Sequence, residues 1–582
     1  MLVLHGIPVS PGFAIGQVRV FHSEDFFSIP AIHIHEDEVP REIARFEEAL
    51  TKTRAELLGI RRKISNEIGH EHSDIFNAHL LILEDRTLIE DVIQKVREEK
   101  VMVERAFSIV VQRYFHAFSQ IDDEYLRERV SDIKDIGRRI MRNLMGHEKE
   151  SLSDLKEPII IIAHDLSPSE TASMDKKNVI AFATDIGGPT SHTAIMARSL
   201  EIPAVVGLDR ISKEVVNGDT VIVDGTRGDV ILDPDTETLD RYNREEKRFI
   251  ELISELDKLQ KLPAKTLDGH QITLSANIEF PDEIPSVLAH GADSIGLYRT
   301  EYFYLNRPDL PTEEEQFEAY KTVAEKMAPK EVVVRTLDLG GDKFLSSMEL
   351  PHEMNPFLGW RAIRFCLTRV DIFKVQLRAV LRASAFGHFK IMFPMISTIS
   401  EFQKAREILN DAKEELKREG VKIDDQIQVG AMIEIPSAAV ISDILAKSCD
   451  FFSIGSNDLI QYALAVDRGN EKIAYLYQPT HPAILKLVSQ IITNGKKEKK
   501  WVGICGEMGG DPIAALLLVG LGIDEISTSA FVLPKVKKAV RSVRFDQLTK
   551  MTRKAMRFST AEEIRDFAEQ EIKKMAPDLF AE

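Results

Sequence analysis

The sequence has few of the features that mark extracellular, membrane or nucleic-acid-binding proteins. Its 582 residues include three cysteines (Cys366, Cys449 and Cys505), which fits a reducing compartment, and their spacing does not match a zinc site. No apolar run reaches the roughly 20 residues of a membrane helix, and the first residues do not resemble a secretion signal. The net charge of -18 argues against a basic nucleic-acid-binding face. We therefore expect a cytoplasmic protein without membrane insertion or a nucleic-acid partner.

The composition is that of a globular protein, with 44% apolar and 29% charged residues, and the length favours two or three domains. Between about residues 37 and 144, apolar residues recur at helical spacing, as at Ile43, Phe46 and Leu50. Proline is absent between Pro40 and Pro158, so long helices are allowed. This segment is predicted to be a helical bundle.

Short β-branched runs lie on both sides of the helical segment. One run covers about residues 15–21, and the runs PIIIIA, NVIAFATD, PAVVG, TVIVDG and DVILDP follow Pro158, separated by Gly, Pro and Asp. The simplest topology is an α/β domain into which the bundle is inserted. Residues 239–262 are charged, have a helical pattern and contain no Gly or Pro, which predicts a connecting helix.

Eight further strand-like runs alternate with helical patterns over the rest of the chain. They cover residues 271–278, 294–302, 331–343, 389–397, 428–438, 451–459, 501–511 and 524–529. Eight strands alternating with helices over about 300 residues are typical of a (β/α)8 (TIM) barrel, in which the active site lies at the carboxyl ends of the strands.

Those strand ends are unusually polar. Guanidinium groups bind phosphate and carboxylate bidentately, and two carboxylates are hard oxygen ligands suited to Mg²⁺. A single charged residue is usually a solvated surface group, and Cys505 is as easily a buried structural thiol as a proton donor. The convergence favours a doubly anionic substrate with a divalent metal. The polar residues at the strand ends and in adjacent loops are Arg299, Arg335, Asp338, Lys343, Arg361, Glu434, Asn457, Asp458, Arg468, Cys505 and Glu507.

A second candidate site is the segment DIGGPTSHTAIMARS at residues 185–199, where an apolar strand runs through Gly187 and Gly188 into a helical pattern. Glycines let a backbone approach a ligand, and a helix N-terminus favours phosphate. A neutral imidazole is a competent nucleophile, so His192 is placed to carry a phosphoryl group. Taken alone, this pattern more often describes a histidine that caps an ordinary turn.

Eight segments match a known family in order and at suitable spacing. They are DLSPSETA, GGPTSHTAIMARSLEIPAVVG, GLYRTEYFY, RTLDLGGDK, NPFLGWRAIR, MIEIPSA, SIGSNDLIQY and GICGEMGGD. Over essentially its whole length the chain resembles the Enzyme I family of the bacterial phosphoenolpyruvate (PEP):sugar phosphotransferase system. The resemblance implies that a phosphoryl group passes from PEP to an enzyme histidine and then to a phosphocarrier protein, releasing pyruvate.

The resemblance also implies a domain arrangement. Residues 1–30 and 150–235 would form a swivelling phosphohistidine α/β domain, and residues 31–149 an inserted helical domain that binds the histidine-containing phosphocarrier protein. Residues 236–262 would be a linker helix. Residues 263–582 would form the PEP-binding TIM barrel, which would also form a homodimer.

Residue roles follow from the same resemblance. His192 would be phosphorylated, with Thr171 near its ring, and Cys505 would protonate the enolate of pyruvate. Mg²⁺ would bind Glu434 and Asp458. The substrate would bind Arg299, Arg335, Arg361, Arg468, Lys343 and Asn457. The phosphocarrier would contact Leu80, Leu81 and Glu84, a stripe that the residues alone would assign to the core of the bundle.

One departure from the family is visible, because Pro189 stands where the usual turn GGRTSH has arginine. The change removes a cation beside His192 and keeps open an alternative function, a catalytically silent PEP-sensing regulator that binds the phosphocarrier. A pyruvate-phosphate dikinase or PEP synthase would need a large nucleotide-binding domain, for which the stretch before the helical segment leaves no room.

Overall fold

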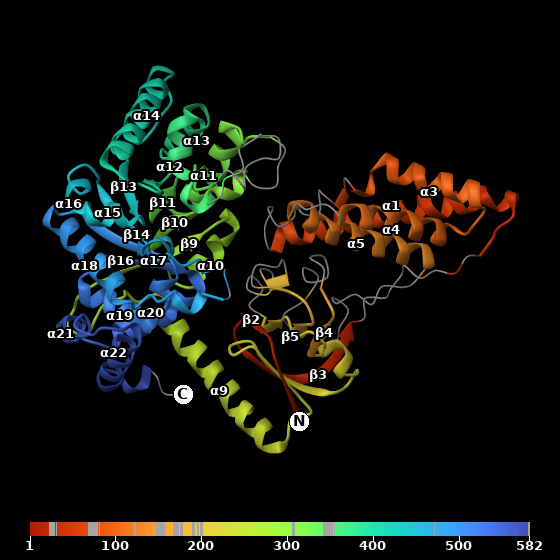
Figure 1. The fold of residues 1–582 in the computed structure, drawn as a ribbon, viewed down its shortest axis with the longest axis horizontal. Coiled ribbons are helices and arrows are strands. Elements are labelled where there is room, and N and C mark those ends of the chain that lie inside the picture. The colour runs from red at the N-terminus through yellow and green to blue at the C-terminus, as the bar shows by residue number, and fades with distance from the viewer. Residues whose placement is uncertain are drawn as a thin grey trace. The chain divides into compact units, whose positions relative to one another are not determined.

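Two units make up the computed structural model, Met1–Ile253 and Ser254–Glu582, and each is described by itself (Figure 1). The structure describes residues 1–21, 30, 32–67, 79–80, 82–119, 124–146, 157–166, 174, 178–188, 193–194, 197, 202–304, 309–340, 353, 355–468, 470 and 472–579.

The first unit contains an eight-stranded sheet in the order β1-β8-β7-β3-β4-β5-β6-β2. Strands β3, β4, β5 and β6 are parallel, and the remaining neighbours are antiparallel. Val18 of β3 pairs with Ile160 of β4, so strands before and after the helical segment are neighbours, as the predicted insertion requires. The strands are β1 (Leu2–His5), β2 (Ile7–Ser10), β3 (Phe13–Phe21), β4 (Ile159–Ala163), β5 (Val179–Thr184), β6 (Ala204–Val206), β7 (Thr220–Asp224) and β8 (Asp229–Leu232).

The helical segment follows β3 and packs around its own apolar core. Its helices are α1 (Val39–Glu67), α3 (Arg86–Glu99), α4 (Val103–Ser119) and α5 (Glu124–Met145). Phe46, Phe107 and Ile140 are buried in that core. Two further helices in this half of the chain are the short α8 (Ile211–Glu214) and the long α9 (Thr236–Leu259).

The second unit is a closed barrel in the order β10-β11-β12-β13-β14-β15-β16-β9, and all neighbouring strands are parallel. The strands are β9 (Thr273–Ile278), β10 (Ser294–Tyr298), β11 (Glu331–Arg335), β12 (His388–Phe393), β13 (Gln428–Ile433), β14 (Phe451–Gly455), β15 (Trp501–Cys505) and β16 (Glu525–Ser529). Seven of them lie within the runs taken from the sequence, and β12 begins one residue before its run, at His388. The predicted fold class, an α/β domain with a helical insert followed by a TIM barrel, is confirmed.

Helices surround the barrel (Figure 1). They are α10 (Ile284–Ala289), α11 (Glu313–Met327), α12 (Ala362–Thr368), α13 (Val370–Ala383), α14 (Ile399–Arg418), α15 (Pro436–Val440), α16 (Ser442–Leu445), α17 (Ser456–Leu464), α18 (Pro482–Lys497), α19 (Pro512–Leu521), α20 (Leu533–Arg541), α21 (Phe545–Ala555) and α22 (Ala561–Met575). Among the described residues, no helix is long and apolar enough to cross a membrane.

The barrel interior changes character along its axis. An apolar cluster of Leu297, Val333, Met392, Met432, Phe451 and Cys505 fills the inside of the strands. At the amino end of β16, the buried Glu525 accepts hydrogen bonds from Ser275 (2.5 Å) and from the indole of Trp501 (3.1 Å). The apolar cluster thus lies between this polar group and the carboxyl ends of the strands.

Arg45 joins three helices of the insert, which generates a stability prediction. Its guanidinium pairs with the buried Glu42 of α1 at 2.8 Å and with the buried Glu104 of α4, and donates to the carbonyl of Leu144 in α5 at 3.1 Å. Replacing Arg45 with Ala would leave two buried carboxylates unpaired. We expect Arg45→Ala to destabilise the insert by about 2 kcal/mol, measured by hydrogen exchange of peptides from α1 and α4.

The matched control is Lys52→Ala on the same helix. Lys52 pairs with Glu48, and both side chains are more than half exposed. That change should alter the stability by less than about 0.5 kcal/mol. Equal effects of the two substitutions would contradict the role assigned to Arg45.

Candidate active site

The carboxyl ends of the barrel strands carry the polar residues predicted from the sequence. Arg299 directly follows β10, Arg335 ends β11, and Glu434 directly follows β13. Asn457 and Asp458 lie in the first turn of α17, just after β14, and Cys505 ends β15. Because the strands are parallel, their carboxyl ends lie at the same rim. Lys343 lies outside the described residues.

The centre of this rim is a buried network of charges. Asp338 lies between two arginines, with Oδ2 2.9 Å from Nη1 of Arg335 and Oδ1 2.8 Å from Nη2 of Arg361. Nη2 of Arg335 donates to Oε1 of Glu301 at 3.0 Å, and the backbone N–H of Asp338 donates to the same oxygen at 3.2 Å. The two guanidinium groups are therefore held in fixed positions by carboxylates of the protein.

Electrostatics keep the two arginines and Asp338 ionised, whereas burial raises the pKa of Glu301 above its ordinary value. Burial by itself would lower the pKa of Arg335, but the carboxylates of Glu301 and Asp338 raise it above its ordinary value. Burial likewise opposes the charge on Asp338, but Arg335 and Arg361 hold the pKa of its carboxyl below the ordinary value. The Nε atoms of Arg335 and Arg361 are buried, and neither has a hydrogen-bond partner among the described residues. Each arginine thus keeps a donor that an anionic ligand could use.

Two carboxylates lie beside this network. Oε1 of the buried Glu434 accepts a hydrogen bond from the backbone of Met395 at 2.6 Å, whereas Oε2 has no partner among the described residues. Burial raises the pKa of Glu434 well above its ordinary value, and the charge of Asp458 raises it further. A buried oxygen without a partner and a second carboxylate are chemically suited to a divalent cation, so the two residues fit the predicted metal.

The described residues contain no group of three or more His, Cys, Asp or Glu arranged to hold a metal. Two carboxylates alone are consistent with Mg²⁺, which usually keeps several waters and shares oxygens with a substrate phosphate. Zinc, which takes three or four protein ligands, fits this pair less well.

Glycines make room for these side chains at the rim. A Cβ on Gly455 would lie 2.6 Å from Oε2 of Glu434. At Gly506, where φ is +119°, a Cβ would lie 2.4 Å from Oγ of Ser456 and 2.7 Å from Oδ1 of Asn457. The amide oxygen of Asn457 accepts from the backbone of Glu507 at 3.1 Å, which fixes the orientation of its side chain.

Cys505 lies at the boundary between the apolar interior and the charged rim. Burial raises the pKa of its thiol to about 11, while a hydrogen bond from Ser453 and the charge of Arg335 oppose the rise. The thiol is therefore protonated at neutral pH, which an acid catalyst requires.

The remaining predicted arginines are more exposed. Arg299 pairs with Glu279, and Arg468 pairs with Glu507.

On α17, the helix that carries Asn457 and Asp458, the hydroxyl of Tyr462 donates to the carbonyl of Phe357 at 2.6 Å. This bond joins α17 to the segment that leads into Arg361.

In the first unit, the described residues flank the candidate histidine. His192, Pro189 and Thr171 themselves lie outside the described residues. Before the turn, the buried Asp185 accepts from the backbone and hydroxyl of Ser212 at 2.8 and 2.5 Å and lies 2.9 Å from Nδ1 of His164. Gly187 has φ +135°, in the region that favours glycine. After the turn, the buried Thr193 donates to the carbonyl of Leu166 at 2.9 Å. The described residues on both sides of positions 189–192 are thus held by hydrogen bonds.

The predicted phosphocarrier contacts differ in exposure. Leu80 is partly buried against the core of the helical insert, and Glu84 is exposed and pairs with Arg54 at 2.8 Å. Leu81 lies outside the described residues. Their role in binding stays a prediction.

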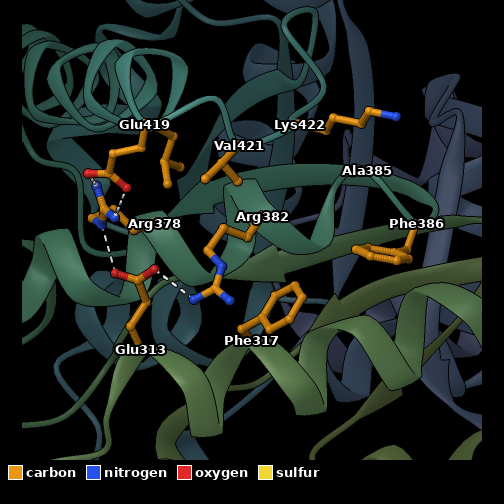
Figure 2. A pocket seen from close by; sticks show the side chains of 10 residues that line it. Glu313, Phe317, Arg378, Arg382, Ala385, Phe386, Glu419, Val421 and Lys422 are labelled. Atoms are coloured by element: carbon orange, nitrogen blue, oxygen red, sulfur yellow. Dashed lines mark hydrogen bonds and ion pairs between the residues drawn. The ribbon is translucent and has the colours of Figure 1, made fainter.

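A pocket on the outer helices also contains arginines (Figure 2). Arg378 donates to Glu313 at 2.7 Å and to Glu419 at 2.8 Å, and Arg382 donates to Glu313 at 2.8 Å and lies over the ring of Phe317. These two guanidinium groups are paired with the carboxylates of Glu313 in α11 and of Glu419, which directly follows α14. This pairing stabilises the packing of the outer helices.

Sequence reasoning missed three residues in and around the barrel site, namely Glu301, which contacts the buried charge network, Ser453, which contacts Cys505, and Tyr462, which contacts Phe357. Glu301 lies within the segment GLYRTEYFY, two residues after Arg299, and its burial could not be read from the sequence. For Ser453 a signal existed, because strand alternation places it on the same face of β14 as Phe451.

Comparison with known proteins decides the family. Three family models match the chain: PEP-utilising enzyme, N-terminal, at residues 5–129; mobile domain, at 155–228; and PEP-binding domain, at 254–545. The phosphoenolpyruvate-protein phosphotransferase of Staphylococcus carnosus is 46% identical over 571 residues, covering 98% of this chain and 99% of the relative.

The chain belongs to the phosphoenolpyruvate-protein phosphotransferase family. The Bacillus subtilis member is 47% identical over 573 residues, covering 98% of this chain and 100% of its own. A solution structure described as Enzyme I (nEIt) protein is 45% identical, covers 42% of this chain and 99% of its own, and has a TM-score of 0.37. The family and the enzyme class predicted from the sequence are confirmed.

The buried thiols of this phosphotransferase generate a pH prediction. Burial raises the pKa of Cys505 to about 11 and those of Cys366 and Cys449 above their usual range. Since the thiolate is the reactive form, all three should react with a disulfide reagent at about pH 8 about a hundredfold more slowly than an exposed thiol. The reactivity of Cys505 should rise with pH above 8 and level off only near pH 11.

The measurement is the release of thionitrobenzoate over time. In concentrated guanidinium chloride the same sample should release three equivalents rapidly, one for each cysteine. A native thiol that reacts at the rate of an exposed one would contradict the assigned burial.

Proposed function

We propose that this phosphotransferase moves the phosphoryl group of PEP onto His192 and then onto the histidine of a phosphocarrier protein, releasing pyruvate, as the first step of sugar uptake. Phosphoryl transfer from PEP is the activity that the relatives' name states. The observation that carries the proposal is the pair of buried arginines, Arg335 and Arg361, each paired with Asp338 and each with an Nε that has no partner among the described residues.

The rim would bind both anionic groups of PEP. Arg335 and Arg361 are preorganised, so they stabilise charge without rearranging during the reaction. Arg299 and Arg468 lie further out and would exchange their pairing with Glu279 and Glu507 for contacts with the substrate. Lys343 and Asn457 are proposed to complete the site.

Glu434 and Asp458 would hold Mg²⁺. The free Oε2 of Glu434 supports this assignment, as does the effect of Asp458 on its pKa. When bound, the ion neutralises phosphate charge and orients the phosphoryl group for transfer.

Cys505 would supply the proton that converts the departing enolate to pyruvate. Its pKa of about 11 keeps the proton on sulfur at neutral pH, and its position at the end of β15 places the thiol at the rim.

The proposed domain arrangement follows the predicted boundaries. Residues 1–30 and 150–235 would carry His192, with Thr171 near its ring, and would alternate between PEP and the phosphocarrier. The helical insert, residues 31–149, would bind that carrier near Leu80, Leu81 and Glu84. Residues 236–262 would link the two parts. The barrel, residues 263–582, would bind PEP and pair with a second copy, and the protein would act in the cytoplasm.

The second candidate function is a silent PEP-sensing regulator that binds the phosphocarrier. It remains a candidate because Pro189 stands where the family usually has arginine. The first test is therefore pyruvate release after mixing with PEP and Mg²⁺. We expect about one pyruvate per chain without carrier and sustained turnover with it. PEP binding without pyruvate release would favour the regulator and make Pro189→Arg the next variant.

His192→Ala should abolish both phases because it removes the phosphoryl acceptor, while PEP binding remains. His5→Ala, which changes an exposed histidine paired with Asp229, should behave as the unmodified protein. The readouts are pyruvate formation and PEP affinity by calorimetry. Sustained transfer by His192→Ala would reject this assignment.

A second prediction concerns the metal. Glu434→Gln should raise the Mg²⁺ concentration needed for half-maximal rate at saturating PEP by about tenfold or more, because it removes a charged ligand. Glu525→Gln is the matched control, since Glu525 is also a buried carboxyl whose pKa is raised by burial but lies at the other end of the barrel. An unchanged Mg²⁺ requirement in Glu434→Gln would exclude Glu434 as a ligand.

A further inference from the structure

A buried hydroxyl next to Cys505 has no role in the mechanism above. Oγ of Ser453 lies 3.5 Å from Sγ of Cys505 and donates a hydrogen bond to it. Both side chains are buried. Among the described residues, Ser453 is the side chain from which this sulfur accepts a hydrogen bond.

The position of Ser453 follows from the geometry of two neighbouring strands. Phe451 of β14 and Cys505 of β15 both belong to the cluster inside the barrel. Side chains alternate along a strand, so Ser453 faces the interior with Phe451. In the register of the two strands, Ser453 pairs with Gly503 and Gly455 pairs with Cys505. Ser453 therefore lies one layer deeper in the barrel than Cys505, on the side away from the rim.

The surroundings of Cys505 make this hydroxyl important after the proton leaves. The neighbours in the cluster are Leu297, Val333, Met392, Met432 and Phe451, none of which stabilises an anion by a hydrogen bond. The carbonyl of Ile454, 3.7 Å from the sulfur, can accept a hydrogen bond from the thiol but has no hydrogen to donate to a thiolate. An unpaired buried charge is costly, and a hydrogen bond to a charged group offsets part of this cost.

We propose that Ser453 is a positioning residue for proton transfer by Cys505, stabilising through its hydrogen bond the thiolate that forms when pyruvate is made. This proposal rests on the proposed function. In the step, the S–H bond of Cys505 breaks and its electron pair stays on sulfur. The π electrons of the enolate form the new C–H bond at the methylene carbon, which yields pyruvate, and water later reprotonates the thiolate.

The reverse step isolates this proton transfer. With PEP, pyruvate and Mg²⁺ present in deuterium oxide, Cys505 as a thiolate removes a methyl proton of pyruvate and returns a deuteron. The rate is the loss of the methyl signal in proton NMR. Ser453→Ala should exchange about tenfold more slowly than the unmodified protein, as expected for the loss of one hydrogen bond to a charged group.

The control is Ser527→Ala, which removes a different buried hydroxyl inside the barrel, one that donates to Asn277 at 2.5 Å. It should exchange at the rate of the unmodified protein. Labelling of each variant by radioactive phosphate from PEP to the same final level shows that the variants are folded and accept the phosphoryl group.

A double substitution separates positioning from packing. In Cys505→Ala, exchange should fall by a factor larger than in Ser453→Ala, and adding Ser453→Ala should cause no further loss. The proposal would be overturned if Ser453→Ala exchanged within about twofold of the unmodified rate. It would also be overturned if adding Ser453→Ala slowed exchange by the same factor in the unmodified protein and in Cys505→Ala. Unchanged exchange in Cys505→Ala would also overturn the proposal, because Cys505 would then not transfer the proton. Absence of phosphate labelling in the unmodified protein would instead reject the proposed function itself.

Discussion

Asp338, buried between Arg335 and Arg361, is the interaction on which the arrangement of the barrel rim depends. Two guanidinium groups and two carboxylates, those of Asp338 and Glu301, lie where water is largely excluded. Removing such groups from water is unfavourable unless they are paired with good geometry. Their mutual pairing satisfies this condition and leaves the Nε donors of both arginines available. The two guanidinium groups are therefore held in place before any ligand arrives, which favours electrostatic stabilisation over rearrangement.

The same barrel places an apolar interior directly below a charged rim. Below the rim, Leu297, Met392 and Met432 exclude water, so the thiol of Cys505 remains protonated. At the rim, Glu434 and Asp458 concentrate negative charge next to the arginines. Burial raises the pKa of Cys505 and the pKa of Glu434, but the two groups have different neighbours.

The sequence predicts the barrel well because parallel strands buried on both faces appear as continuous apolar runs. It also places Arg299, Arg335, Glu434 and Cys505 at the rim, because each follows such a run directly. Strands β1 and β2 were missed, since each has four residues and β2 contains Pro8. Burial of Glu301 was not predictable, because it depends on Arg335, 34 residues away in the chain.

Residue roles were predictable only in part. Charge type and position at strand ends indicate an anion site with a divalent cation, but the assignment of PEP as the anion came from the family resemblance. For Ser453, the sequence predicts the orientation of the side chain but not its contact. Its inward orientation follows from alternation along β14, but its hydrogen bond to Cys505 requires the register between β14 and β15, which the sequence does not specify.

The glycines at the ends of β14 and β15 have a consequence for how this site can evolve. At Gly455 and Gly506, even one methyl group would collide with Glu434 or Asn457. Side chains larger than glycine are therefore excluded at these two positions. Variation in substrate preference must come from residues in the loops around the rim. Libraries for directed evolution of this barrel would gain most by holding both glycines constant and randomising the segment that contains Phe357.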